Sequence, residues 1–267
     1  MKRHVQQFLC VLIWFAGAVV GNVYLCEASA EEQDELIGFY NQWFDEATQE
    51  QPRLRNLVKA YQEVNHYEAK WELRNPVTNE IGDLEAWPII QIAFDRKAGL
   101  ILYRISVPDE ASPDEPDHSI GTRDTVIFDG TAVHLISDDG HGNRSHNSLP
   151  IEGDVAFEQF HRVFPFALTP DLALLISNMP VMRIMQTTPD KVNEVAETDE
   201  DYPGVYIHDE FGEISAFFGI SDEHHLVKLF RLERLDAPEA SVILKLVELQ
   251  TDHPIDDQVF APTTYLP

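Results

Sequence analysis

The segment Val126–Val133 reads VIFDGTAV and places the pair Asp129-Gly130 between two apolar runs. An Asp-Gly pair in this setting is the strongest short-range signal for a β-hairpin. We therefore expect strands at 125–128 and 132–136. The hairpin decides the fold class, because the segments on both sides repeat its pattern of short strands and turn residues.

Upstream of the hairpin, Tyr67, Ala69, Trp71 and Leu73 alternate with polar side chains, which predicts a half-buried strand. Other short apolar runs bounded by turn residues predict strands at 89–94, 100–107, 144–149, 181–186, 192–196, 205–208, 214–218, 226–232 and 242–249. About a dozen strands without helical crossovers predict an antiparallel meander. Residues 108–119 hold three prolines and five acids, which indicates an exposed loop.

Three segments have helical periodicity. Residues 34–48 form one apolar stripe through Leu36, Phe39, Tyr40, Trp43, Phe44 and Ala47, and a second stripe follows at 54–61. Residues 155–178 predict one or two short helices in the middle of the strand series. A sheet of a dozen strands must curl or close. We expect a mostly β (α+β) fold: a single curled antiparallel sheet of about eleven or twelve strands forming an incomplete barrel. The N-terminal helix and the mid-chain helical insertion would cover its concave face.

The first thirty residues have the pattern of a secretory signal. A basic head at 1–4 precedes an apolar run at 8–20, and Ala28-Ser29-Ala30 supplies small residues for cleavage after Ala30. The run is shorter than the ~20 residues of a membrane-spanning helix. An uncleaved N-terminal anchor and a lipidated Cys26 are the alternatives. We expect a periplasmic or extracellular protein with a single domain at 31–267.

The composition restricts the partners. The chain has 19 basic and 46 acidic residues, a formal net charge of −27, which repels nucleic acid and anionic membrane surfaces. Cys10 and Cys26, the two cysteines, lie within the predicted signal. The mature chain would therefore be stabilised by core burial without disulfides.

Motifs for catalysis or metal binding are absent from the sequence. His141 and His146, and the adjacent His224 and His225, fit neither an HExxH motif nor a Cys/His framework. The chain has no GxSxG, SxxK or P-loop motif. We expect no metal, no cofactor and no enzymatic activity. Weak calcium binding around residues 138–140 and a glycosidase pair of carboxylates stay open as alternatives.

The order of elements resembles that of the periplasmic outer-membrane lipoprotein carriers and related lipoprotein-sorting proteins. Three segments carry the resemblance: Phe94–Leu100 as strand, charged turn and strand, Val126–Val133 as the Asp-Gly hairpin, and Leu249–Pro262 as closing strand and tail. The resemblance implies an incomplete barrel with a helical lid. Arg74 and Arg104 are both candidates for the arginine that pairs with the lid in that family.

The resemblance also implies a function, which is to shield acyl chains of a lipid or lipoprotein in a hydrophobic concave sheet. A membrane-bound donor or acceptor protein would be a second partner, and the chain would act as a monomer. The candidate lining residues are Trp71, Leu73, Ile90, Ile92, Leu102, Phe128, Phe160, Phe164, Leu172, Leu175 and Met182. The alternatives are a secreted interaction or sensor domain of the same fold with a filled core, and a hydrolase with a polar cleft.

Overall fold

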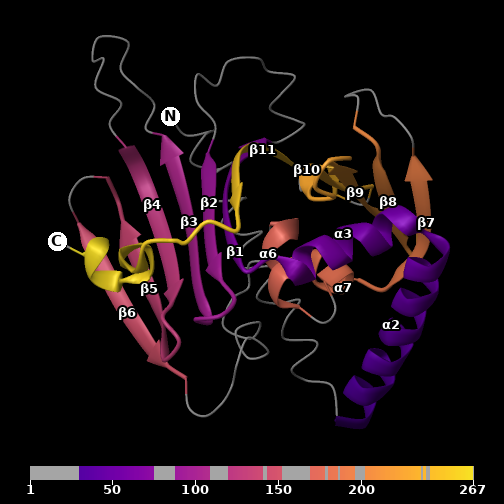
Figure 1. Ribbon diagram of the computed structural model, residues 1–267, viewed down its shortest axis with the longest axis horizontal. Helices are drawn as coiled ribbons and strands as arrows, with labels where there is room; N and C mark the ends of the chain where they lie inside the picture. Colours follow the sequence, from indigo (N-terminus) through magenta and orange to yellow (C-terminus); the bar gives the residue numbers. More distant parts are fainter. Residues whose placement is uncertain are drawn as a thin grey trace. The chain divides into compact units, whose positions relative to one another are not determined.

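Strands dominate the computed structural model (Figure 1), which describes residues 30–74, 88–108, 120–140, 143–151, 169–177, 180–185, 187–195, 202–235, 237–238 and 241–266. Eleven strands in these residues are hydrogen-bonded in the order β6-β5-β4-β3-β2-β1-β11-β10-β9-β8-β7. Because the order ends on two different strands, β6 and β7, the sheet is not closed. The predicted fold class, a mostly β protein with one antiparallel sheet, is confirmed.

Strand bounds agree with the sequence pattern to within a few residues for ten of the strands. The strands are β1 (His66–Arg74), β2 (Ile89–Asp95), β3 (Leu100–Pro108), β4 (Ile120–Phe128), β5 (Ala132–Asp138), β6 (Arg144–Pro150), β7 (Pro189–Val195), β8 (Gly204–Asp209), β9 (Ile214–Ile220), β10 (Val227–Arg234) and β11 (Val242–Thr251). The exception is β4, which begins five residues before the predicted 125–128.

The chain divides into two compact units. We call the first the helical unit; it holds α2 (Ala30–Glu50), α3 (Pro52–Glu63) up to Gln62, α6 (Pro170–Ile176), α7 (Pro180–Met185) and strands β7 to β10. The second, the β1–β6 unit, holds those six strands, β11 from Leu244 and the C-terminal tail. Each unit is described by itself.

In the β1–β6 unit, strands pair in sequence order through short turns. Asp129 and Gly130 lie in the turn between β4 and β5, where Gly130 has a φ of 88°, a conformation that glycine adopts without strain. The predicted hairpin is therefore confirmed. The C-terminal tail, with short 3-10 turns at Asp257–Phe260 and Pro262–Thr264, crosses the strands of this unit (Figure 1) and packs on β2 to β5.

In the helical unit, α3 (Pro52–Glu63) follows its predicted stripe, because Leu54, Leu57, Val58 and Tyr61 are all buried. The stripe predicted for α2 is partly wrong. Tyr40 and Ala47 are buried, but Phe39 is 52% exposed. The buried side of α2 therefore lies at 40, 43, 44 and 47, a spacing of three and four residues that leaves Phe39 outside it.

The strand predicted at 181–186 is wrong, because α7 occupies Pro180–Met185. Val181, Ile184 and Met185 are buried and lie three and four residues apart, as on one side of a helix. Pro180 suits the first helical position, where its missing N–H costs no hydrogen bond. The predicted helical insertion is described in part: α6 lies within it, and 155–168 fall outside the described residues, as do residues 1–29 of the predicted signal.

Candidate functional site

One face of the β1–β6 unit is apolar over five neighbouring strands; we call it the apolar face. Strand register places Trp71 opposite Ile90, Ile92 opposite Tyr103, and Ile101 opposite Phe128. Because alternate residues of a strand share a face, the register extends this face to a larger set: Tyr67, Ala69, Trp71, Leu73, Ile90, Ile92, Phe94, Ile101, Tyr103, Ile105, Val126, Phe128, Val133 and Leu135.

Five of the predicted lining residues share this apolar face: Trp71, Leu73, Ile90, Ile92 and Phe128. Trp71, Ile90 and Ile92 expose none of their surface, and Phe128 exposes 6%. Leu73 is half-buried near the end of β1. The ligand-free fold therefore covers most of this set with protein, and a ligand reaches these side chains only when the covering residues move.

Leu102, another of the predicted lining residues, lies elsewhere. It pairs with Ala93 on one side and with Ile127 on the other, so it lies on the opposite face from Ile92 and Tyr103. There it is fully buried in a cluster with Ala93, Ile127, Ile136 and Phe260 of the tail. Leu102 therefore does not share a face with Trp71 and Ile90, because both faces of β3 are apolar and the tail packs on the second one.

The remaining predicted residues belong to the helical unit or fall outside the described residues. Leu172 and Leu175 are buried on α6, which contacts α7 and β10. Met182 on α7 is half-buried, and α7 contacts β7 and β9. Phe160 and Phe164 lie outside the described residues. Leu172, Leu175 and Met182 thus belong to the helical unit, whereas the apolar face belongs to the β1–β6 unit.

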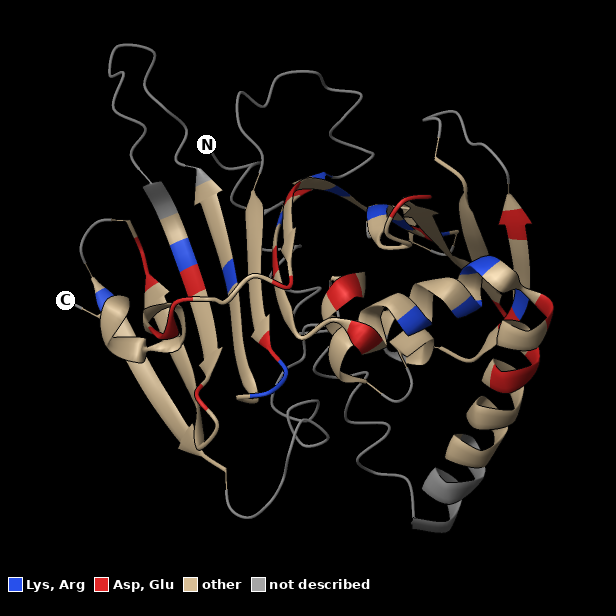
Figure 2. Cartoon of the chain, viewed as in Figure 1, with Lys and Arg blue, Asp and Glu red and all other residues tan. Residues whose placement is uncertain are grey.

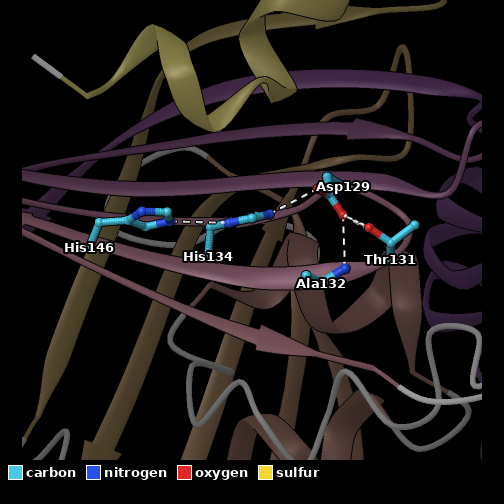
Figure 3. Close-up of polar contacts among 5 residues, drawn as sticks. All are labelled: Asp129, Thr131, Ala132, His134 and His146. Atoms are coloured by element: carbon cyan, nitrogen blue, oxygen red, sulfur yellow. Dashed lines mark hydrogen bonds and ion pairs between the residues drawn. The ribbon is translucent and has the colours of Figure 1, made fainter.

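The second face of the β1–β6 unit carries a line of three ionisable side chains (Figure 3). Nε2 of His134 lies 2.9 Å from Oδ2 of Asp129, and Nδ1 of His134 lies 3.2 Å from Nε2 of His146. A carboxylate only accepts hydrogen bonds, so Nε2 of His134 carries the proton toward Asp129. In neutral His134, Nδ1 then accepts a hydrogen bond from Nε2–H of His146.

Asp129 is held by its own turn as well as by His134. Its Oδ1 accepts hydrogen bonds from the backbone N–H of Thr131 and Ala132 and from the Thr131 hydroxyl, at 2.8–2.9 Å. Partial burial acts to raise the pKa of Asp129, but the hydrogen bonds from His134, Thr131 and Ala132 outweigh it and lower the pKa to about 2. Asp129 is therefore a carboxylate over the whole range in which histidine titrates.

This array was only partly indicated by the sequence. His146 is singled out there beside His141, which lies outside the described residues, whereas its partner is His134 on the neighbouring strand. His134 and Asp129 are five residues apart in sequence, and the hairpin turn between them brings their side chains into contact. Both ring nitrogens of His134 face ionisable partners, an arrangement that orders the turn and leaves neither nitrogen to activate a serine or cysteine.

Two further properties concern metals and membranes. Within the part of the chain that the structure describes, no group of three or more His, Cys, Asp or Glu side chains is placed to hold a metal ion. Among the same residues, no helix combines the length and the apolar character that crossing a membrane requires.

Comparisons with known proteins give matches among solved structures. No protein-family model matches the chain, and neither does any curated protein. The chain is similar to the MucA/MucB complex of Pseudomonas aeruginosa, with 15% identity over 79% of this chain and 60% of that chain and a TM-score of 0.39. It is similar to a crystal structure of MucB, with 15% identity over 79% and 62% of the two chains and a TM-score of 0.38.

A further similar structure is a LolA superfamily protein, NE2245, from Nitrosomonas europaea. Here the identity is 8%, over 79% of this chain and 98% of that chain, and the TM-score is 0.35. The chain thus spans about three fifths of the MucB chains that it matches and nearly all of the LolA superfamily chain. Identities of 8 to 15% transfer no function to this chain.

Proposed function

We propose that this chain is an exported, non-enzymatic binding protein that shields acyl chains against the apolar face of its β1–β6 unit. The observation that carries the proposal is the continuity of that face across β1 to β5. Neighbouring strands lie about 4.8 Å apart, so five strands present an apolar width of about 19 Å. Each CH₂ group buried there would contribute about 0.8 kcal/mol.

Binding in this proposal requires movement. Trp71, Ile90 and Ile92 are completely buried without ligand, so an acyl chain would replace the residues that cover them. The exchange of one apolar cover for another keeps the apolar surface out of water in both states. In this proposal the protein therefore covers the apolar face when no acyl chain is bound.

The same burial favours a second candidate function. If the cover over Trp71, Ile90 and Ile92 never leaves, the apolar face is an ordinary core. The chain would then be an exported interaction or sensor domain that uses its outer surface.

Native mass spectrometry of the chain, purified without detergent from a membrane-containing host and followed by lipid extraction, separates the two candidates. A stoichiometric acyl-bearing adduct, or saturable binding of an added fluorescent fatty-acyl probe, is the expected result. A clean apo mass together with no probe binding would overturn acyl shielding and leave the interaction domain.

A matched pair of variants locates the site. Ile92 and Ile127 are both completely buried, lie two strands apart and face opposite sides of the sheet. Ile92→Ala and Ile127→Ala delete the same atoms, and each should cost about 2–5 kcal/mol of stability. Only Ile92→Ala should weaken binding of the acyl probe. Equal weakening of probe binding by both variants would contradict binding at the apolar face.

Leu175→Asp on α6 tests the predicted helical lid. Probe binding should be lost, while the β-rich circular dichroism spectrum persists.

A further inference from the structure

Three arginines lie close together on the second face of the β1–β6 unit, opposite the apolar face. Arg104 on β3 pairs with Thr125 on β4, and Arg123 lies two residues before Thr125. Arg123 pairs with Asp138 on β5, which in turn pairs with Arg144 on β6. Directly paired and alternate residues share a face, so Arg104, Arg123 and Arg144 project from the same side. Basic residues on β3 and β4 stand out in Figure 2.

These arginines share one carboxylate, Asp138. Nε of Arg144 donates a hydrogen bond to Oδ2 of Asp138 at 2.8 Å. The backbone N–H of Gly140 and the guanidinium groups of Arg144 and Arg123 hold the pKa of Asp138 below its usual range. Asp138 is the one carboxylate that an ion pair joins to this cluster within the described residues, and that ion pair is with Arg144 rather than with Arg104 or Arg123.

Arg104 lies beside the C-terminal tail. It is half-buried and its guanidinium lies 5.4 Å from the centre of the Tyr265 ring, on the C-terminal tail. Burial lowers the pKa of Arg104, and the neighbouring charges of Arg123 and Arg144 lower it further, against the opposing influence of Tyr265 and Asp138. The fold thus holds like charges near one another, and a bound anion would relieve their repulsion.

We propose that Arg104, Arg123 and Arg144 form a binding site for a phosphate group, either free or on a lipid headgroup. A phosphate monoester carries a charge of about −1.5 to −2 at pH 7 and three acceptor oxygens. That charge is opposite to the formal charge of +2 that the three arginines and Asp138 carry together. Guanidinium groups bind phosphate through paired N–H donors in a fixed geometry. Asp138 supplies a carboxylate to Arg144, and within the described residues no second acid forms an ion pair with the cluster.

The acidic character of the rest of the chain makes this cluster selective. The formal net charge of −27 repels anions at long range. At physiological ionic strength the Debye length is about 8 Å, so a bound anion interacts chiefly with the adjacent arginines. Non-specific attraction of phosphate to this chain is therefore weak, and saturable binding would report the cluster itself. The site lies on the opposite face from the proposed acyl site, so the two proposals stand or fall separately.

Titration of the full chain with inorganic phosphate by isothermal calorimetry tests the proposal. We expect saturable one-to-one binding, weakened 10-fold or more in Arg123→Gln and in Arg144→Gln. Lys191→Gln removes the same charge from a side chain that is 76% exposed on β7 and should bind like the wild type. No phosphate binding by the wild type, or equal binding by wild type and Arg123→Gln, would overturn the proposal, as would an equal loss in Lys191→Gln.

A second measurement separates the two sources of phosphate. Co-sedimentation with vesicles of phosphatidic acid in phosphatidylcholine, compared with phosphatidylcholine alone, reports a lipid headgroup. Sedimentation with phosphatidic acid that depends on Arg123 would assign the lipid headgroup as the ligand. Binding of inorganic phosphate without sedimentation would assign the free anion.

Thermal unfolding distinguishes a phosphate-binding role of Arg123 from a purely structural one. Because the arginines repel one another, Arg123→Gln should keep or raise the unfolding temperature without phosphate and lose the rise that phosphate gives the wild type.

Discussion

Nε2 of His134 donates a hydrogen bond to Oδ2 of Asp129 over 2.9 Å, and this bond ties the turn between β4 and β5 to the second of the two strands. The other carboxylate oxygen of Asp129 closes the turn through Thr131 and Ala132. One side chain therefore fixes both the turn and its register against β5. Register matters here because a slip of one residue would exchange the apolar face for the face that carries the arginines.

Asp129→Asn should lower the free energy of unfolding by about 2 kcal/mol at pH 7, since hydrogen bonds to a charged group contribute roughly 1.5–3 kcal/mol. An asparagine can still accept from the turn, but its amide N–H₂ would face the N–H of His134. Urea unfolding at pH 7 measures the loss. The exposed Asp222→Asn is the control and should stay within about 0.5 kcal/mol of the wild type; a similar value for both variants would contradict the role of Asp129.

The pH dependence of stability should carry the signature of Asp129. Its pKa is about 2 in the folded chain and 3.8 ordinarily, so the folded state binds its proton less readily. The stabilisation is fully present above pH 3.8 and is lost as the pH falls toward 2. The stability difference between wild type and Asp129→Asn should therefore be constant from pH 7 to about pH 4.5 and should shrink below that. A difference that stays constant down to pH 2 would show that Asp129 titrates normally.

Gly204 and Gly38 should respond to alanine in opposite directions. A Cβ on Gly204 would lie 2.4 Å from the carbonyl oxygen of Phe218 and 2.5 Å from the ring of Phe217, so β8 and β9 would have to separate. Gly204→Ala should cost about 1–3 kcal/mol or more. Gly38 lies in α2 with nothing within 4 Å of an added Cβ, and Gly38→Ala should stabilise by about 0.5–1 kcal/mol. Chemical unfolding of the two variants checks both signs; a neutral Gly204→Ala would mean that the two strands can move apart freely.

The strands could be predicted because each one combines a short apolar run with turn residues at its ends. Asp129-Gly130 is the clearest case, since the turn requires a positive φ that glycine supplies. The same reasoning fails for α7. Its apolar run is only six residues long, and periodicity over so few residues fits a strand and a helix equally well.

The prediction of the site from sequence is incomplete, because only the pairing of strands shows which side chains share a face. Periodicity assigns Ile90 and Ile92 to one face of β2, but on β3 both Tyr103 and Leu102 are apolar, so the pattern does not say which faces the same way. The tail residue Phe260, more than 150 positions later, decides it by covering Leu102. Arg104, Arg123 and Arg144 are likewise separated by 19 and 21 residues in sequence, and they meet only through the β3–β4, β4–β5 and β5–β6 pairings.

The C-terminal tail should contribute strongly to stability through Phe260. Its side chain is 3% exposed and packs with Leu102, Ile127 and Ile136, so Phe260→Ala should lower the free energy of unfolding by about 3–5 kcal/mol. Phe211→Ala removes the same ring from a turn where it is 72% exposed and should change stability by no more than about 0.5 kcal/mol. Urea unfolding compares the two, and hydrogen exchange at Leu102 and Ile127 shows whether the loss is local to the tail-covered face. A small effect of Phe260→Ala, with unchanged protection at these two residues, would mean that the tail is not needed to cover that face.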